Sequence, residues 1–450
     1  MNAISPPERA DMPVEGRRQV LLLQSLMGPF FRRIGQALLR DGYGVHKVNF
    51  NGGDQLFWRL PGAINYTGRP SDWPDALARI IAARGITDVL LFGDCRPLHS
   101  AAIAVCRNLH IAVHVFEEGY IRPDWVTLEL DGVNGHSSLP RDPNYYRDRA
   151  AQLPPAPEHQ SVPSSFRRRA LESIAYNAAD LLTRWRYPHW DNHRPWHPLI
   201  EGVGWLKRLS DRKAAAARTA ALLARLEASP EPYMLFPLQL DADAQVRLHS
   251  SLDGVADAIR QVVASFAAHA PAQLRLIVKE HPLDNGVTDW RALTAEAAGA
   301  AGVAARVDYM ESGDVAVIVR AARGLITINS TTGTLALACG VPVITLGHAV
   351  YGLRDITFQG TLDEFWSNPG LPDAATFAAF RRVLIDRCLV PGGFFSEPAL
   401  EKLVNSAIAR LEAHSPRHFA ATSRACRDRT ATSSAYEPLA LGHGLESARG

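Results

Sequence analysis

The chain has 450 residues, of which 47% are hydrophobic and 21% charged, and its formal net charge is +2. A chain this long is too large for one ordinary core and too apolar to stay disordered, so two domains are expected. The near-neutral charge argues against a nucleic-acid-binding protein.

Four short apolar runs predict the strands of a buried parallel sheet: residues 19–25, 43–50, 87–94 and 111–119. The segments between them carry apolar residues at helical spacing. This alternation predicts a Rossmann-like α/β domain over residues 16–150.

Residues 151–228 contain no convincing strand, and their second half has a strongly helical composition, so they are expected to form a helical connector. Strand-like runs return after residue 231, at 231–239, 274–282, 323–330 and 341–347. They predict a second Rossmann-like domain over residues 229–413. Residues 414–450 are small, polar and non-periodic, which predicts a loose tail. The fold class expected from this order is α/β and GT-B-like, with two Rossmann-like domains and a helical connector.

The cysteines and the N-terminal residues indicate the compartment. Five cysteines are scattered without a CxxC pair, which indicates neither a disulfide framework nor a zinc site. No apolar segment follows a basic start, so no secretory signal is expected. The uncharged stretch 324–353 is interrupted by Asn329 and Pro342, which favours a buried strand, helix and strand over a membrane span. We expect a cytoplasmic protein.

Ligands of open α/β sheets bind outside the carboxyl ends of the strands, so polar residues directly after the predicted strands are candidate binding residues. The first half offers Gly28, Asn51 and Asp54, and the second half offers Gln239. The Gly-Gly-Asp sequence that ends at Asp54 is also a common turn.

Two further motifs in the second half favour an anion site. Proline ends a strand just after His281, and Lys279 and His281 point to the same side of that strand. Asn329, Ser330 and Thr331 precede an apolar helix, where they can act as N-caps or present N–H groups and hydroxyls to a phosphate. A single histidine in such a position is often only structural.

Glu117 and Glu118 stand side by side at the end of a buried strand. Like charges that repel and lose water should raise at least one pKa, as a general acid/base needs. A solvated loop pair, or a salt bridge to Arg122, is the structural alternative. Adjacent strand residues face opposite ways, so either glutamate can be the one that faces the cleft.

These motifs together resemble a known family. The stretches "GPFFRRIGQALLRDGYGVHKVNFNGGDQLFW", "FEEGYIRPDW", "PLQLDADAQVR", "VKEHPLD" and "INSTTG" are similar to capsular polysaccharide biosynthesis proteins of the KpsS/LipB type. The Glu-Glu-Gly, His-Pro and Ser/Thr motifs also resemble those of bacterial sialyltransferases and polysialyltransferases. The first resemblance implies a retaining β-Kdo glycosyltransferase that moves Kdo from CMP-Kdo to a phosphatidylglycerol lipid, which starts the poly-Kdo linker of a capsule.

The resemblance also implies roles for residues. Lys279, His281, Asn329, Ser330 and Thr331 would bind the cytidine phosphate with positive charge and N–H donors. No cofactor and no obligatory metal are expected. Asp243 is the implied nucleophile, and one of Glu117 and Glu118 is the implied acid/base.

The segment around Asp243 allows a second interpretation and also differs from the family at one position. Asp241 and Asp243 match the DxD pair of metal-using glycosyltransferases, but a histidine-based anion site makes a metal site there the weaker interpretation. The chain has Asp-Ala-Gln where the family wording is Asp-Ser-Gln, which removes any help from that serine hydroxyl. Gly28, Asn51 and Asp54 would face the acceptor, and Arg141 is a candidate partner for the Kdo carboxylate.

The connector has a composition suited to a membrane surface. Between Arg167 and Arg218 the sequence has eleven Lys/Arg and five Asp/Glu, and four tryptophans lie in the same window. Cations interleaved with indoles favour an anionic lipid surface, although a solvated helical arm has a similar composition. The implied localisation is cytoplasmic and peripheral on the inner membrane, with a second Kdo transferase and the capsule export complex as possible partners.

Two other functions stay open. The chain can be a GT-B transferase for another CMP-sugar, such as CMP-sialic acid. It can also be a non-catalytic scaffold of the capsule machinery. A nucleic-acid binder is a more distant alternative.

Overall fold

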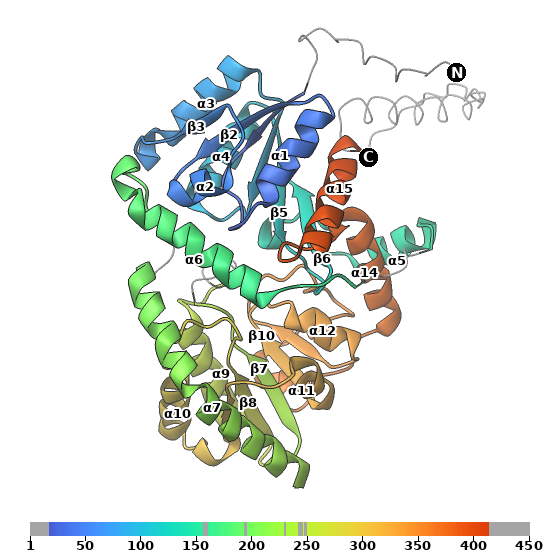
Figure 1. Cartoon of the computed structure of the whole chain (residues 1–450). Helices are drawn as coiled ribbons and strands as arrows, with labels where there is room; N and C mark the ends of the chain where they lie inside the picture. The colour runs from blue at the N-terminus through green and yellow to red at the C-terminus, as the bar shows by residue number, and fades with distance from the viewer. Residues whose placement is uncertain are drawn as a thin grey trace, which may run out of the picture.

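The computed structural model describes residues 18–155, 161–192, 196–228, 231–241, 246 and 250–413. Figure 1 shows two α/β units stacked on each other, with helices of the connector running along one side. The described part of the chain contains no helix that is both long enough and apolar enough to cross a membrane.

The first unit is built on a seven-stranded sheet with the order β12-β6-β5-β4-β1-β2-β3. Its strands are β1 (Gln19–Leu22), β2 (Gly44–Asn49), β3 (Ala63–Asn65), β4 (Asp88–Phe92), β5 (Ala112–Glu118), β6 (Trp125–Leu130) and β12 (Leu389–Pro391). β1 to β5 pair in parallel, whereas β6 is antiparallel to both β5 and β12. The expected buried parallel sheet is therefore present, with an antiparallel edge that the apolar runs did not indicate.

Helices cover both faces of this sheet, and the alternation of side chains along β1 shows why its sequence is continuously apolar. Leu21 belongs to the core under α3 (Trp73–Arg84) and α4 (Pro97–Asn108). Its neighbours Val20 and Leu22 belong to the opposite core, under α1 (Phe30–Arg40) and α15 (Glu397–Ala413). A strand buried on both faces needs apolar residues at every position.

The second unit has a five-stranded parallel sheet with the order β11-β10-β7-β8-β9. Its strands are β7 (Tyr233–Pro237), β8 (Arg275–Lys279), β9 (Val307–Met310), β10 (Gly324–Thr327) and β11 (Val343–Thr345). α9 (Val255–His269) and α10 (Trp290–Ala300) cover one face, and α11 (Val315–Ala321) and α12 (Thr332–Ala338) cover the other. The strand order reverses beside β1 and beside β7, which creates the two switch points where such sheets bind ligands.

The connector consists of two long helices, α6 (Phe166–Leu182) and α7 (Pro198–Ala228). α6 packs on α2 (Gly52–Phe57) of the first unit, and α7 contacts β9 of the second. The helical connector expected from the sequence is thus observed, and it touches both units.

The end of the described chain returns to the first unit. α14 (Ala374–Arg387) packs on α5 (Pro143–Gln152), β12 pairs with β6, and α15 packs on α1. The sequence analysis placed all of 229–413 in the second domain, whereas 374–413 lie against the first unit. β12 pairs with β6, which lies about 260 residues earlier in the chain. Such a pairing leaves no local pattern in the sequence, so the sequence analysis could not assign residues 374–413 to the first unit. The predicted tail, 414–450, lies outside the described residues.

The remaining short elements complete the order along the chain. They are α13 (Leu362–Phe365) and the 3-10 turns η1 (Pro70–Asp72), η2 (Asn134–His136), η3 (Arg184–Arg186) and η4 (Ala304–Arg306). Two α/β units of this kind with a helical connector form the GT-B-like architecture that the sequence predicted.

Candidate active site

Two predicted site residues meet at the switch point of the second sheet. Gln239 follows β7 and Asn329 follows β10, and these strands are neighbours. The Gln239 amide donates to Asn329 Oδ1 at 2.8 Å, and the Asn329 backbone N–H donates to Gln239 Oε1 at 3.0 Å. The paired bonds hold the start of the 329–331 turn in place.

A small cavity of about 20 Å³ lies between the two units at this turn. Tyr120 and Asn134 line it from the first unit, and Asn329, Thr331 and residues 348–351 line it from the second. Thr334 Oγ1 donates to the Tyr120 carbonyl at 3.1 Å, which joins the two walls. The segment after β5 and the segment after β10 therefore form one site.

A buried hydrogen-bond network holds the wall of the first unit. The Tyr120 hydroxyl donates to Glu129 Oε1 at 2.5 Å and accepts from the Asn134 N–H at 2.6 Å. Ser137 donates to the other Glu129 oxygen at 2.6 Å. Burial raises the pKa of Glu129 although both hydroxyls oppose it. The sequence analysis did not select Tyr120 or Glu129, because nothing local distinguishes them from core residues.

The residues before α12 divide into structural and cavity-facing groups. Ser330 Oγ accepts from the Thr332 N–H at 3.2 Å, which stabilises the turn before α12, whereas the N-cap residue Thr331 makes no side-chain capping bond. Thr331 lines the cavity instead. Asn329 combines a place on the wall with its pairing to Gln239.

The His281 ring accepts a hydrogen bond in this structure. Its Nδ1 atom accepts from the Leu283 N–H at 3.0 Å, so the neutral ring carries its proton on Nε2. Burial lowers the pKa of His281 to about 4, and the nearby Arg122 and Arg169 act in the same direction. At neutral pH the imidazole therefore supplies an N–H donor, and the positive charge must come from its neighbours.

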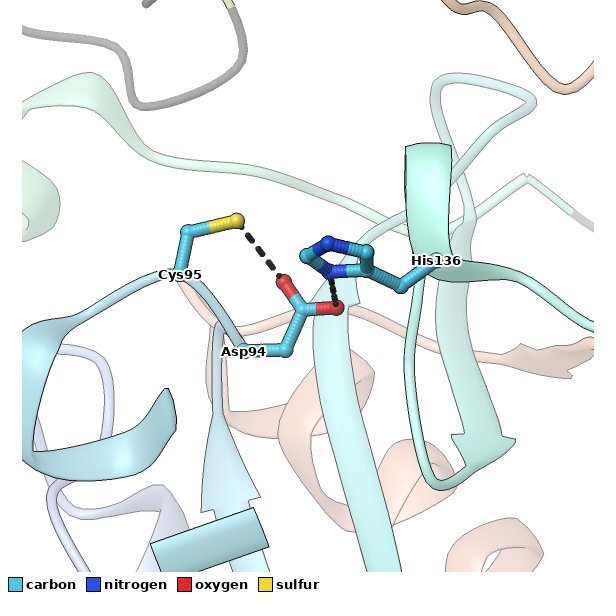
Figure 2. Close-up of side chains that lie close together, drawn as sticks. All are labelled: Asp94, Cys95 and His136. Atoms are coloured by element: carbon cyan, nitrogen blue, oxygen red, sulfur yellow. Dashed lines mark hydrogen bonds and ion pairs between the residues drawn. The ribbon is translucent and has the colours of Figure 1, made fainter. Parts of the chain in front are cut away.

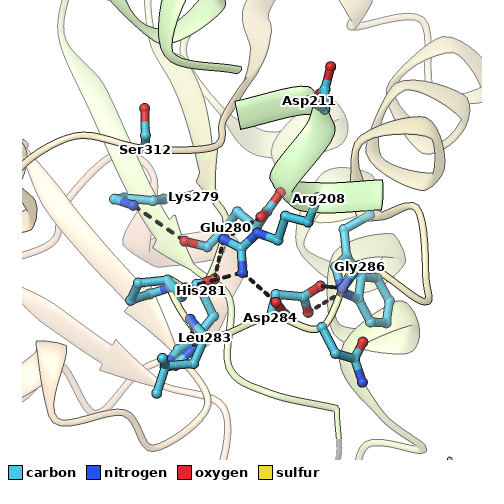
Figure 3. Close-up of polar contacts among 12 residues, drawn as sticks. Arg208, Asp211, Lys279, Glu280, His281, Leu283, Asp284, Gly286 and Ser312 are labelled. Carbon is cyan, nitrogen blue, oxygen red and sulfur yellow. Dashed lines mark hydrogen bonds and ion pairs between the residues drawn. The ribbon is translucent and has the colours of Figure 1, made fainter. Parts of the chain in front are cut away.

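Arg208 of α7 holds the turn that carries His281 (Figure 3). Its guanidinium pairs with the Glu280 carboxylate at 2.8 Å and donates to the carbonyls of His281 at 3.2 Å and Pro282 at 3.1 Å. Lys279 is buried at the end of β8, and burial lowers its pKa. The sequence analysis missed Arg208, since more than 70 residues separate it from its partners.

The paired glutamates have different environments. Glu118 forms ion pairs with Arg122 at 2.8 Å and Arg169 at 3.1 Å. Burial alone would raise its pKa, but the two arginines outweigh burial and lower it. The expected rise in pKa is therefore wrong for Glu118, and the alternative of a salt bridge to Arg122 is observed. Glu117 Oε1 accepts from the Glu118 N–H at 2.9 Å.

Comparison with known proteins identifies the family. The profile of the family described as "Capsule polysaccharide biosynthesis protein" matches residues 87–395. The chain is 33% identical over 381 residues to the capsule polysaccharide export protein KpsS of Escherichia coli, covering 84% of this chain and 97% of KpsS. The chain belongs to the capsule polysaccharide biosynthesis protein family.

A second curated relative and a solved structure are also similar to this chain. The capsule polysaccharide modification protein LipB of Neisseria meningitidis serogroup A is 34% identical over 403 residues, covering 85% of this chain and 93% of LipB. Among solved structures, the KpsC β Kdo 2,7 transferase of Thermosulfurimonas dismutans matches at 15% identity and a TM-score of 0.36. That match covers 82% of this chain and all of the KpsC chain. The family resemblance stated from the motifs is confirmed.

In this capsule biosynthesis protein, two of the three predicted acceptor residues lie at a second, smaller hollow of about 10 Å³. Gly28 and Asp54 line it, together with Arg32, Lys47 and Tyr176. Burial lowers the pKa of Lys47 to about 8.

A buried polar network beside this hollow fastens α6 to the first unit. The Asn51 amide donates to the Tyr176 hydroxyl at 2.8 Å, and that hydroxyl donates to Asp54 Oδ1 at 3.1 Å. Gln24 also donates to the Tyr176 hydroxyl, at 2.7 Å. Asn51 and Asp54 are thus engaged with each other and with α6.

Two other predicted residues have structural partners. Arg141 donates to the Ala349 carbonyl at 2.7 Å, so it joins the two units beside the first cavity. Asp241 Oδ1 accepts from the Val255 N–H at 3.2 Å at the start of α9. Asp243, the predicted nucleophile, lies outside the described residues.

A third group of polar side chains follows β4 (Figure 2). Asp94 Oδ2 accepts from the Val133 N–H at 2.9 Å and pairs with His136 Nδ1 at 3.0 Å, while Cys95 Sγ donates to Asp94 Oδ1 at 3.1 Å. A buried carboxylate of this kind orients an imidazole, and the three side chains are also types that bind zinc. The sequence analysis missed the group because 42 residues separate Asp94 from His136.

Proposed function

We propose that this protein is a retaining β-Kdo glycosyltransferase that moves Kdo from CMP-Kdo to a phosphatidylglycerol-type lipid and so starts the poly-Kdo linker of the capsule. The observation that carries the proposal is the cavity between the units, where the segment after Glu118 meets Asn329 and Thr331. Membership of a capsule biosynthesis family and the similarity to KpsS and LipB support it.

The donor would bind at the second unit. Lys279, the Nε2–H of His281 and the turn of Asn329, Ser330 and Thr331 would hold the phosphate and the cytidine, with Gln239 keeping Asn329 in position. These groups provide N–H donors and one ammonium group, so the proposal includes neither a cofactor nor an obligatory metal.

The transfer would take two displacements, as retention requires. In the first, an Asp243 oxygen bonds to the anomeric carbon of Kdo while the bond to the CMP oxygen breaks, and its electron pair leaves with CMP. In the second, the acceptor hydroxyl gives its proton to a glutamate and attacks the same carbon, which releases Asp243. Glu117 suits the acid/base role better than Glu118, because two arginines lower the pKa of Glu118 and so make it a weaker base.

The acceptor would approach from the first unit. The hollow beside Gly28 and Asp54 carries Arg32 and Lys47, which suits an anionic head group. Arg141 lies at the joint between the units, where it donates one N–H to the Ala349 carbonyl. Its remaining N–H groups would pair with the Kdo carboxylate. The corresponding localisation is the cytoplasmic side of the inner membrane, with a second Kdo transferase and the capsule export complex as further partners and no nucleic acid.

The test is a transfer assay with purified protein, CMP-Kdo and phosphatidylglycerol, followed by mass spectrometry of the lipid. We expect a product one Kdo heavier than the lipid, and its loss in Asp243→Ala. Transfer from CMP-sialic acid but not from CMP-Kdo would support the alternative donor. A stably folded protein that binds no CMP-sugar and forms no product would point to a scaffold.

A further inference from the structure

Exposed apolar side chains are concentrated on the connector. Among the described residues, fifteen large hydrophobic side chains are exposed, and eleven of them lie between residues 166 and 209. On α6 and the turn η3, they are Leu171, Ile174, Leu181, Leu182 and Trp185, with exposed fractions of 44% to 79%. Spacings of three, seven and one residues place the four α6 side chains along one side of the helix, and Trp185 follows in η3.

The first half of α7 repeats this feature. Leu199, Ile200, Val203, Leu206 and Leu209 are exposed by 49% to 68%. Single exposed apolar side chains are common on soluble proteins, whereas a concentration of them on neighbouring segments of the chain marks an interaction site. We call these ten side chains the connector surface.

The opposite sides of the same helices are already used by the protein. Tyr176 of α6 bonds to Asn51 and Asp54, and Arg169 of α6 pairs with Glu118. Arg208 of α7 holds the His281 turn. Each helix therefore has one side fixed to the candidate site and another side facing solvent (Figure 1).

Exposed cations flank the connector surface. Arg167, Arg184, Arg186, Lys207, Arg212 and Lys213 are all exposed, and none of them forms an ion pair with a carboxylate in the part of the chain that the structure describes. Apolar side chains that are bordered by unpaired cations match the acyl and phosphate layers of an acidic bilayer.

We propose that the connector surface binds the surface of an acidic phospholipid bilayer, with its apolar side chains at the level of the acyl chains and its cations on the lipid phosphates. The proposal deepens the proposed function and rests on it for the lipid acceptor. Because α6 and α7 also contact the two halves of the candidate site, docking in this orientation holds that site directly over the membrane. The charge of the flanking residues favours a membrane over an apolar protein partner, which would not need six unpaired cations.

The test is co-sedimentation of the full-length protein with vesicles. We expect binding to vesicles of phosphatidylglycerol and phosphatidylethanolamine, and at least about tenfold weaker binding to neutral phosphatidylcholine vesicles or at high salt. Leu171→Gln with Ile174→Gln and Leu182→Gln should weaken binding to acidic vesicles by about tenfold or more, because apolar area that enters the bilayer is lost. Glutamine keeps the helix propensity close to that of leucine, so the fold should persist.

The matched control replaces two exposed apolar residues elsewhere, Val317→Gln and Leu371→Gln, which are exposed by 58% and 85%. This control should bind vesicles like the wild type. If the triple variant on α6, shown to be folded by circular dichroism, binds acidic vesicles as strongly as the control, the proposal is overturned. Wild-type protein that ignores vesicles but self-associates, with the triple variant monomeric, would also overturn it in favour of a second copy.

The two proposals fail differently. A wild-type protein that binds acidic vesicles but transfers no Kdo contradicts the proposed function and leaves the connector surface standing. Normal transfer to a lipid dispersed in detergent, together with unchanged vesicle binding of the triple variant, contradicts the connector surface and leaves the function standing.

Discussion

Glu117 and Glu118 show how the two faces of a strand give neighbouring residues different chemistry. The pleat of β5 directs adjacent side chains to opposite sides. Glu118 meets Arg122 and Arg169, which lower its pKa, and Glu117 accepts a hydrogen bond from the Glu118 backbone. Under the proposed function, Glu117 is the better acid/base candidate, and we propose Glu118 as a positioning residue.

The two glutamates can be separated by matched substitutions. Glu117→Gln should lower kcat by about 100-fold or more with little change in KM, since a proton transfer is lost. Glu118→Gln should mainly raise the KM for CMP-Kdo, because Arg122 and Arg169 lose their shared partner next to His281. Steady-state kinetics of both variants measure kcat and KM. A loss of kcat in Glu118→Gln and a raised KM in Glu117→Gln would exchange the two roles.

His281 should make the fold sensitive to mild acid. Its folded pKa is about 4, below the ordinary value of 6.5, so the unfolded chain takes up the proton first as the pH falls. Its contribution to stability is complete above pH 6.5 and is lost progressively between pH 6.5 and 4. The loss amounts to about 3.5 kcal/mol at most, from about 1.4 kcal/mol for each pKa unit.

Urea unfolding at several pH values checks this prediction. His281→Asn should remove the His281 component of the decline between pH 6.5 and 4 and leave the carboxylate component at lower pH. A wild type and variant with parallel stability profiles through this window would show that the imidazole is protonated in the folded protein.

At the scale of elements, a side chain of α7 fixes the turn that follows β8, although the two are far apart in the sequence. One guanidinium of α7 satisfies the Glu280 carboxylate and successive carbonyls of the turn after β8. A planar group with five donors can make these contacts at once, and a lysine cannot. The proposed donor site therefore depends on a connector helix that carries none of the recognised motifs.

Removing this clamp should loosen donor binding more than it affects the chemical step. Arg208→Met is expected to raise the KM for CMP-Kdo by about tenfold or more with a smaller change in kcat. The control is Arg225→Met on the same helix, which removes an ion pair with Asp308 away from the turn. Equal donor KM values for the two variants would mean that Arg208 does not position the His281 turn.

At the scale of the whole molecule, the return of the chain end unites the two units. α15 covers one face of the first sheet with Leu400, Leu403 and Ala407, while α14 packs on α5. The chain thus passes between the two units twice, once in the connector and once in this return. Two chain crossings restrict how far the units can separate, because α14 and α15, which follow the second unit in the chain, are packed on the first unit.

A substitution at Leu403 measures how much the packing of α15 on the first unit stabilises the fold. Leu403 is fully buried against α1 and the first sheet, so Leu403→Ala should lower the free energy of unfolding by about 2–5 kcal/mol. Leu371→Ala, at an exposed position, should change it by less than about 0.5 kcal/mol. Denaturant unfolding measures both, and similar small effects would show that α15 packs loosely.

Metal dependence is a second property of the whole molecule. Chelation with EDTA should leave transfer from CMP-Kdo unchanged, because the proposed donor site relies on N–H groups and Lys279. Loss of activity that zinc restores would contradict this expectation and direct attention to Asp94, Cys95 and His136.

Much of the candidate site could be predicted from positions directly after strands. Gln239, Asn329 and Thr331 were selected in this way, and they do gather at one switch point. Arg208 and His136 could not be selected, since each acts on residues at least 40 positions away. No window along the sequence contains both partners of such a contact.

The sequence by itself determined the alternation of strands and helices, the buried sheets and the family. It could do so because a strand buried on both faces must be apolar along its length, and such runs are visible locally. Only the tertiary structure decided the neighbours: Glu118 with two arginines, His281 with Arg208, and β12 with β6. The pKa and the role of a side chain follow from the charges and the solvent around it in space, and these come from segments far apart in the chain.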